Sequence, residues 1–243
     1  MKKTGVVLTD MGEKAVKLII LLLLAVLTVW VGQDTYLYPG DYSSEILIWT
    51  NDNLFLQFAV SAAVVVLTGI LSGILFRGKN ENQKRRFVNW YAAAIMALTG
   101  ILLIIWVAQT RFSQSRDAQQ IYYILQKFRS GDYSDMSSCY LQGFQQQLGL
   151  MFLEELMLAI WPDIRIFQYL NVFFILGILF FLYRICDLLF HNQTINLYCL
   201  TASAAFLPMH LYVNLAYGDI LSISLSLMAV WALLRWSETR QKR

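Results

Sequence analysis

The sequence predicts an all-α integral membrane protein with about six transmembrane helices and two interfacial helices on the outer surface. The 243-residue chain is 58% hydrophobic and only 14% charged, whereas about a quarter of the residues of a soluble domain are charged. Its charges are clustered, so that long uncharged stretches lie between them. In lipid such stretches form helices, because the bilayer core offers no water to unpaired backbone groups.

Each long uncharged stretch is interpreted as one span. The first is expected to be an anchor that is not cleaved, because no small-residue cleavage pattern follows it. The fifth contains Pro208, which predicts a kink. The six expected spans cover residues 18–33, 54–76, 88–109, 166–188, 194–214 and 219–236.

Lys and Arg residues predict the orientation, since they are enriched in cytoplasmic loops. They occur at the N-terminus, in the loop 77–88 and at the C-terminus, whereas the acidic loop between the first two spans has none. With six spans, fourteen of the 19 Lys and Arg residues are inside. We therefore expect a multi-pass protein of the cell membrane with both termini in the cytoplasm and one large outer segment, 110–165.

Residues 147–161 form an apolar stretch whose placement is ambiguous. The stretch is short for a span and carries Glu154 and Glu155, and carboxylates inside a membrane are costly. A seventh span here would put the C-terminus outside and leave only ten Lys and Arg residues inside. We expect an interfacial or re-entrant helix on the outer face, with a seventh span as the open alternative.

A second outer helix is predicted over residues 117–129. Asp117 and Gln120 have the spacing of a capping box, and Gly131 is a natural stop. The apolar stripe of this helix consists of Ile121, Ile124, Leu125 and Phe128. Helical spacing on one face is typical of a helix that lies on a membrane surface.

Asp117 is the candidate catalytic residue of this outer segment. Arg111 and Arg116 precede it, close to the exit of the third span. A carboxylate there can accept a proton from an attacking hydroxyl, and the two guanidinium groups can hold a lipid-linked phosphate. A purely structural role stays open, because Asp at a helix start and Arg at an interface are both common.

The turn Tyr217-Gly218-Asp219 lies between the fifth and sixth spans and puts a second carboxylate on the outer side. Two carboxylates on one side of a bundle can share a polar cavity, although Asp219 is equally an N-cap candidate. Arg184 and Asp187 are expected to pair as helix neighbours.

Other classes of site find little support. Three scattered cysteines form neither a disulfide framework nor a metal site. No basic stripe with interleaved aromatic residues is present, which excludes nucleic-acid binding. His210 is expected to be a hydrogen-bonded packing residue.

Residues 117–133, D-A-Q-Q-I-Y-Y-I-L-Q-K-F-R-S-G-D-Y, resemble the first outer loop of GT-C-type membrane glycosyltransferases. The nearest look-alikes are bacterial relatives of the protein mannosyltransferases and the aminoarabinose transferases. Residues 144–149, residues 167–171 and the Tyr217-Gly218-Asp219 turn resemble later segments of that family, in the same order. Ala118 and Gln145 depart from it, since the family has Gln and Pro there. The resemblance covers residues 88–236.

The resemblance implies inverting transfer of a sugar from a polyprenyl-phosphate donor to an acceptor at the outer face of the membrane. Asp117 would be the catalytic base, and Asp219 would organise the donor phosphate or the acceptor. The other expected substrate-binding residues are Arg111, Arg116, Gln147 and Tyr217. Participation of a divalent metal stays open.

The resemblance also predicts the organisation of the chain. We expect a two-span segment over 1–87, a GT-C-like module over 88–236 and a basic cytoplasmic tail over 237–243. Enzymes of this family continue with further spans, so the chain is expected to be the N-terminal portion of such an enzyme. The alternative is a non-catalytic membrane subunit that binds a lipid-linked glycan or a partner transferase.

Overall fold

The structure is a computed structural model. It describes residues 34–37, 48–51, 53–110, 112–114 and 116–241, together with Leu18, Leu22, Ala25 and Val26. Apart from those four positions, the first expected span, 18–33, lies outside the described residues, and so does Arg111. The chain divides into two compact units, Met1–Ile70 and Leu71–Arg243, which are described separately.

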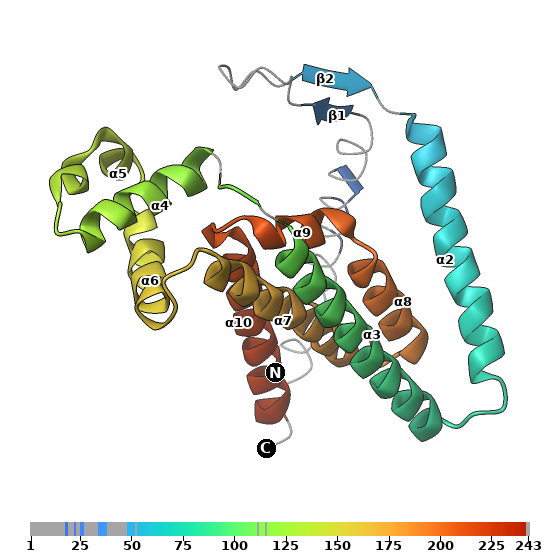
Figure 1. The fold of residues 1–243 in the computed structure, drawn as a ribbon. Helices are drawn as coiled ribbons and strands as arrows, with labels where there is room; N and C mark the ends of the chain where they lie inside the picture. Colours follow the sequence, from blue (N-terminus) through green and yellow to red (C-terminus); the bar gives the residue numbers. More distant parts are fainter. Residues whose placement is uncertain are drawn as a thin grey trace, which may run out of the picture. The chain divides into compact units, whose positions relative to one another are not determined.

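The first unit contains a short antiparallel ribbon. Strand β1 (Asp34–Leu37) pairs with β2 (Ile48–Asn51), with Tyr36 opposite Trp49. Both strands are rich in β-branched and aromatic residues, which suit a pleated surface. An all-α fold class does not include this ribbon (Figure 1), whereas helices form most of the rest of the described chain.

Four helices of the described residues are long and apolar enough to cross a membrane. These helices are α2 (Leu54–Phe76), α3 (Glu81–Gln109), α7 (Arg165–Phe190) and α10 (Gly218–Gln241). They coincide with the expected spans 54–76, 88–109, 166–188 and 219–236. Many of their large apolar side chains are exposed, which is the arrangement that lipid favours. The helices indicate a multi-pass protein in a lipid bilayer.

The expected fifth span, 194–214, is not one helix, and this part of the prediction is wrong. It is divided into α8 (Gln193–Ala204), α9 (Leu207–Leu211) and the 3₁₀ turn η2 (Tyr212–Asn214). The 12 residues of α8 cover about 18 Å, and a bilayer core is about 30 Å thick.

Pro208 explains the break. Its nitrogen has no hydrogen to donate to the carbonyl of Ala204, and its ring would clash with that carbonyl in a continuous helix. The Nε2 atom of His210 instead donates to the Ala204 oxygen at 2.7 Å. The expected kink is therefore a full interruption, and His210 is the hydrogen-bonded residue that the sequence predicts.

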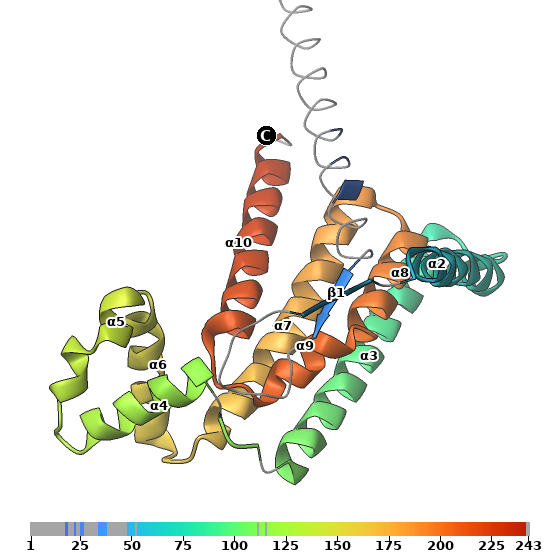
Figure 2. The same cartoon turned by 90° about the horizontal axis from the view of Figure 1, so that it is seen from above.

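Helix α7 is the centre of the second unit, where it packs against α3, α8 and α10 (Figures 1 and 2). Leu103 and Val107 of α3 lie in the same core as Ile175 of α7 and Ile220 of α10. Helices α7 and α10 approach closely at Gly177, where an added Cβ would lie 2.7 Å from the Ser224 Oγ. Small residues at such crossings let membrane helices pack tightly.

At the end of the bundle where α3 begins and α7 ends, Asp187 of α7 connects three helices. Its two carboxylate oxygens accept hydrogen bonds from Arg85 of α3 and Asn196 of α8, each at 3.0 Å. The partner of Asp187 is therefore Arg85 and not the expected Arg184. Nearby, the sulfur atoms of the free cysteines Cys186 and Cys199 lie 3.1 Å apart, a proximity that their sequence spacing does not reveal.

Four short elements form a separate group, the α4–α6 lobe, beside the ends at which α7 and α10 begin (Figures 1 and 2). They are α4 (Arg116–Arg129), the 3₁₀ turn η1 (Ser134–Ser137), α5 (Cys139–Gly143) and α6 (Gln147–Ile160). The apolar stripe of α4 is buried at Ile121, Ile124 and Leu125 and half-buried at Phe128. Ile121 and Ile124 pack on Leu141 and Met151. The stripe predicted from the sequence thus faces protein.

The boundaries of α4 test two further predictions. Gly131, with a φ of 85°, ends the helix, and the Asp132 and Gly131 amides donate to the carbonyls of Lys127 and Phe128 as in a Schellman motif. At the other end, α4 begins at Arg116. Asp117 therefore lies inside the first turn and not at the N-cap position of a capping box.

Helix α6 agrees with the expectation that residues 147–161 are not a span. It has 14 residues, or about 21 Å of length, and it is not among the described helices that could cross a membrane. A seventh span is therefore not supported.

Candidate functional site

The turn that leads into α10 is held by amide side chains from elsewhere in the bundle. Residues 213–216 are not α-helical, so their carbonyl groups need other partners. The Asn171 Nδ2 donates to the carbonyls of Val213 and Leu215, at 3.1 and 2.7 Å. The Gln168 Nε2 donates to the Asn214 carbonyl at 3.2 Å.

Gln114 fixes the same turn from the other side. Its Nε2 donates to the Asn214 carbonyl at 2.9 Å, and its Oε1 accepts from the Ala216 amide at 2.8 Å. Gln114 lies just before α4, and Ala216 lies just before Tyr217. The two hydrogen bonds therefore fix the segment before Asp117 relative to the segment before Tyr217.

Five side chains then gather at this end of the bundle. We call them the Tyr217 site: Asp117 of α4, Tyr140 of α5, Gln147 of α6, Tyr217, and Asp219 of α10. The Gln147 Nε2 donates to the Tyr217 Oη at 2.5 Å. Gln147 is 8% exposed, whereas Asp117 and Asp219 are exposed.

The two carboxylates act on Tyr217 electrostatically. Burial raises the pKa of the Tyr217 hydroxyl most, and the negative charges of Asp117 and Asp219 raise the same pKa further, while the nearby Tyr140 hydroxyl and the hydrogen bond from Gln147 lower it. Asp219 follows Tyr217 by two residues in the chain, and the charge of Asp117, on α4, raises the pKa of both Tyr217 and Tyr140. The structure thus brings together Asp117, Gln147, Tyr217 and Asp219 of the residues predicted from sequence.

Tyr140 is the member of the site that the sequence does not reveal. Burial raises the pKa of its hydroxyl most, with further contributions from Tyr217 and the Asp117 carboxylate. Its oxygen is buried without a hydrogen bond of standard geometry to the described residues. A side chain in this state can still donate to a bound ligand.

The predicted phosphate-binding pair is not placed. Arg111 lies outside the described residues, and Arg116 is described only through its backbone, as the first residue of α4. Their role stays a prediction. The neighbours of Arg111, Thr110 and Phe112, line a polar hollow of about 740 Å³ that Arg165 and Gln168 also line.

Comparison of the chain with protein-family models, with curated proteins and with solved structures finds no match. The interpretation of the Tyr217 site therefore depends on its geometry and on the chemistry of its residues. Within the described part of the chain, no group of three or more His, Cys, Asp or Glu side chains is placed to hold a metal ion.

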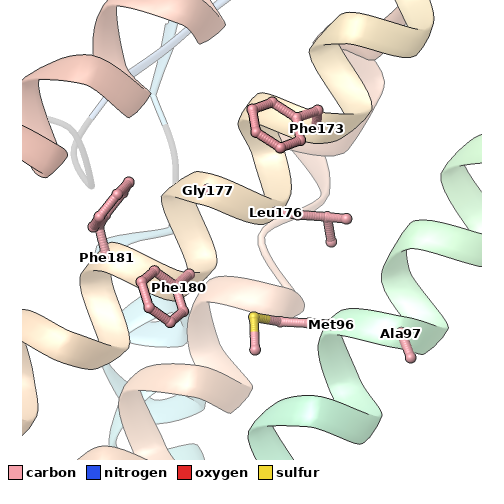
Figure 3. Close-up of a pocket in the computed structure, with 7 residues that line it drawn as sticks. All are labelled: Met96, Ala97, Phe173, Leu176, Gly177, Phe180 and Phe181. Carbon is pink, nitrogen blue, oxygen red and sulfur yellow. The ribbon is translucent and has the colours of Figure 1, made fainter.

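Apolar hollows lie along the spans. One of about 430 Å³ lies between α3 and α7, and Figure 3 shows residues of its wall, among them Met96 of α3 with its side chain toward Phe180 of α7. A second, of about 570 Å³, lies between α3 and the α8–α9 break, with Trp106 and His210 in its wall. Walls of this composition suit hydrocarbon chains.

The arrangement can bind a ligand rich in hydroxyl groups. Two exposed carboxylates can accept protons or hydrogen bonds, and the Tyr140 and Tyr217 hydroxyls can donate. One of the carboxylates can act as a general base towards a bound hydroxyl. Asp117 and Asp219 also sit in the first turns of α4 and α10, where a negative charge stabilises the helix in any case.

Proposed function

We propose that the protein transfers a sugar from a polyprenyl-phosphate donor to an acceptor hydroxyl at the outer face of the cell membrane. The observation that supports this most is the hydrogen bond from Gln147 of α6 to Tyr217, together with the influence of the Asp117 and Asp219 carboxylates on the same phenol. Asp219 lies in the first turn of α10, one of the helices suited to a bilayer. A lipid-carried substrate would meet the site at the membrane surface, with both termini of the protein in the cytoplasm.

In the proposed reaction Asp117 is the general base. It accepts the proton of the acceptor hydroxyl while the acceptor oxygen forms a bond to the anomeric carbon of the sugar. The bond from that carbon to the phosphate oxygen breaks, and polyprenyl phosphate leaves. Attack and departure on opposite faces of the sugar invert its configuration. Arg111 and Arg116 hold the phosphate.

The remaining side chains of the site bind and orient the sugar. Gln147 and Tyr217 are already joined by a hydrogen bond, which limits the directions in which they can donate. Asp219 is exposed beside them and can accept from two neighbouring hydroxyls. Holding the acceptor and the donor in one geometry lowers the barrier by removing the cost of orienting them.

The test is sugar transfer by the full chain in lipid nanodiscs. The donors are undecaprenyl phosphates that carry labelled mannose, glucose or galactose, and the acceptor is a cell-envelope fraction. Loss of a general base costs about 100-fold or more in rate, so Asp117→Asn should lower the transfer rate by at least that factor. The matched control is Asp135→Asn, because Asp135 lies in the same lobe and pairs with Lys127.

Two results would contradict the proposal. An unchanged rate in Asp117→Asn would remove Asp117 from the mechanism. Tight donor binding by the wild-type chain without transfer of any of the three sugars would instead indicate the alternative, a non-catalytic membrane subunit that presents a lipid-linked glycan.

A further inference from the structure

Glu154 of α6 has a buried side chain and lines the same cavity as Tyr217. It is 2% exposed. Together with Asn171 of α7 and Tyr217 it lines a cavity of about 20 Å³, whose other walls are apolar. A cavity of this size holds roughly one water-sized particle.

The neighbouring residue Glu155 shows what Glu154 lacks. Glu155 is about one-third exposed and forms an ion pair with Arg129 of α4, with 3.3 Å between the Arg129 Nη1 and the Glu155 Oε1. Glu154 has no ion pair and no hydrogen bond to any of the described residues. Glu154 is thus the more buried of two adjacent carboxyl groups and the one without an ion pair, whereas Glu155 pairs through its Oε1 and has a buried Oε2 that accepts no hydrogen bond from the described residues.

The charged groups around α6 do not neutralise Glu154. Arg129 and Lys127 of α4 are taken by Glu155 and Asp135, and Arg165 of α7 pairs with Asp163 at 2.6 Å. The titratable side chains nearest α6 along the neighbouring elements are Asp117, Tyr122, Tyr123, Tyr140, Tyr169, Tyr217 and Asp219. None of these is a cation, and only Tyr217 lines the cavity. Two arginines of the packed helices lie further off, since Arg184 follows Asn171 and Arg235 follows Leu221 by more than ten residues, about 20 Å along a helix.

An ionised carboxylate without a partner is costly to bury, and it must be neutralised or compensated. Asn171 and Tyr217 are the other polar residues of the cavity wall, and their oxygen atoms could help to bind a cation that neutralises Glu154. The Asn171 Nδ2 is already used by the carbonyls of Val213 and Leu215, which leaves its Oδ1 as an acceptor. Tyr217 also lines the cavity.

We propose that the cavity at Glu154 is a binding site for one small monovalent cation, either a proton or a sodium ion. The ligands are the Glu154 carboxyl, the side-chain oxygen of Asn171 and the Tyr217 hydroxyl. Because Asn171 also holds the 213–216 turn, the occupant stabilises the backbone that carries Tyr217. The proposal does not depend on the transfer reaction.

The site predicts a direction for the pH dependence of stability. Burial raises the pKa of Glu154 from 4.5 to about 8. A group whose pKa is raised on folding contributes stability that is fully present below its unfolded pKa and is lost as pH rises through the folded value. Stability should therefore fall between about pH 5 and about pH 8 through this residue.

The experiment compares thermal unfolding midpoints of the full chain in detergent micelles by tryptophan fluorescence. Wild type, Glu154→Gln and the matched control Glu155→Gln are measured at about pH 6 and about pH 9, in sodium chloride and in choline chloride of equal ionic strength. In choline, we expect the wild-type midpoint to fall by about 5 °C relative to Glu154→Gln between the two pH values. Glu155→Gln should behave like wild type.

The two salts distinguish the occupants. If sodium binds, it restores the wild-type midpoint at high pH and has no effect on Glu154→Gln. If only a proton binds, the pH effect is the same in both salts. Parallel changes in wild type and Glu154→Gln under all four conditions would overturn the proposal.

A second measurement needs no variant and covers the case in which Glu154→Gln does not fold. Hydrophobic carbodiimides modify protonated carboxyl groups in apolar surroundings. In the wild-type chain, peptide mass spectrometry should find Glu154 modified at about pH 6 and much less at about pH 9, with protection by sodium if sodium binds. A Glu154 that is unmodified at both pH values would contradict the proposal.

Discussion

Tyr217 connects the two features proposed above. Its hydroxyl accepts a hydrogen bond from Gln147, and the negative charges of Asp117 and Asp219 raise its pKa. The same side chain lines the cavity at Glu154. Changes at this one phenol should therefore affect the candidate site and the packing of α6.

The hydrogen bond between Gln147 and Tyr217 can be measured with a double-mutant cycle. Tyr217→Phe leaves the buried Gln147 amide without its acceptor, which should cost about 1–3 kcal/mol in the free energy of unfolding. Gln147→Leu combined with Tyr217→Phe removes both partners and should recover about 1 kcal/mol of that loss. Reversible unfolding in mixed micelles provides the measurement, and strictly additive single effects would contradict the contact.

The sequence indicates Asp117, Gln147, Tyr217 and Asp219 because each stands in a recognisable outer segment. It does not indicate Tyr140 or Gln114. Gln114 contacts residues 100 positions away or more, and no local pattern shows such a pairing. Gln168 and Asn171 do leave a signal, since they are polar residues on one face of an otherwise apolar helix.

Helix existence and helix continuity differ in how well the sequence predicts them. Spans α2, α3, α7 and α10 follow from length and hydropathy alone. The interruption at Pro208 does not, because the apolar character continues through residues 194–214. The backbone hydrogen bond that proline removes, and its replacement by His210, decide the local structure there.

The link among α3, α7 and α8 should depend on Asp187. Asp187→Asn weakens the acceptor for Arg85 and removes its charge, although the bond from Asn196 can persist. We expect the free energy of unfolding to fall by about 1.5–3 kcal/mol, the range for hydrogen bonds to charged groups. Chemical unfolding in detergent provides the measurement. Asp163→Asn serves as a control, because the Asp163 side chain is 29% exposed in its pair with Arg165, against 10% for Asp187, and a more exposed pair should matter less. Equal effects of the two changes would contradict this role of Asp187.

At the scale of the whole molecule, the two ends of the helix bundle in the second unit carry different chain segments. The end of α3 and the starts of α7 and α10 lie with the α4–α6 lobe, whereas Arg85 and Asp187 mark the opposite end. The distribution of Lys and Arg predicts that the lobe is outside the cell and the other end is in the cytoplasm. A multi-pass arrangement follows from the helices, and its orientation stays a prediction.

The most direct test of the Tyr217 site is to measure whether the α4–α6 lobe and the start of α10 lie on the same side of the membrane. Single cysteines at Asp132, Asp219, Asn82 and Thr239 are introduced into a chain without its native cysteines, and intact cells are treated with a membrane-impermeant maleimide. Asp132→Cys and Asp219→Cys should be labelled in intact cells, and Asn82→Cys and Thr239→Cys only after permeabilisation. Labelling of Asp132→Cys and Asp219→Cys from opposite sides of the membrane would show that the site does not exist.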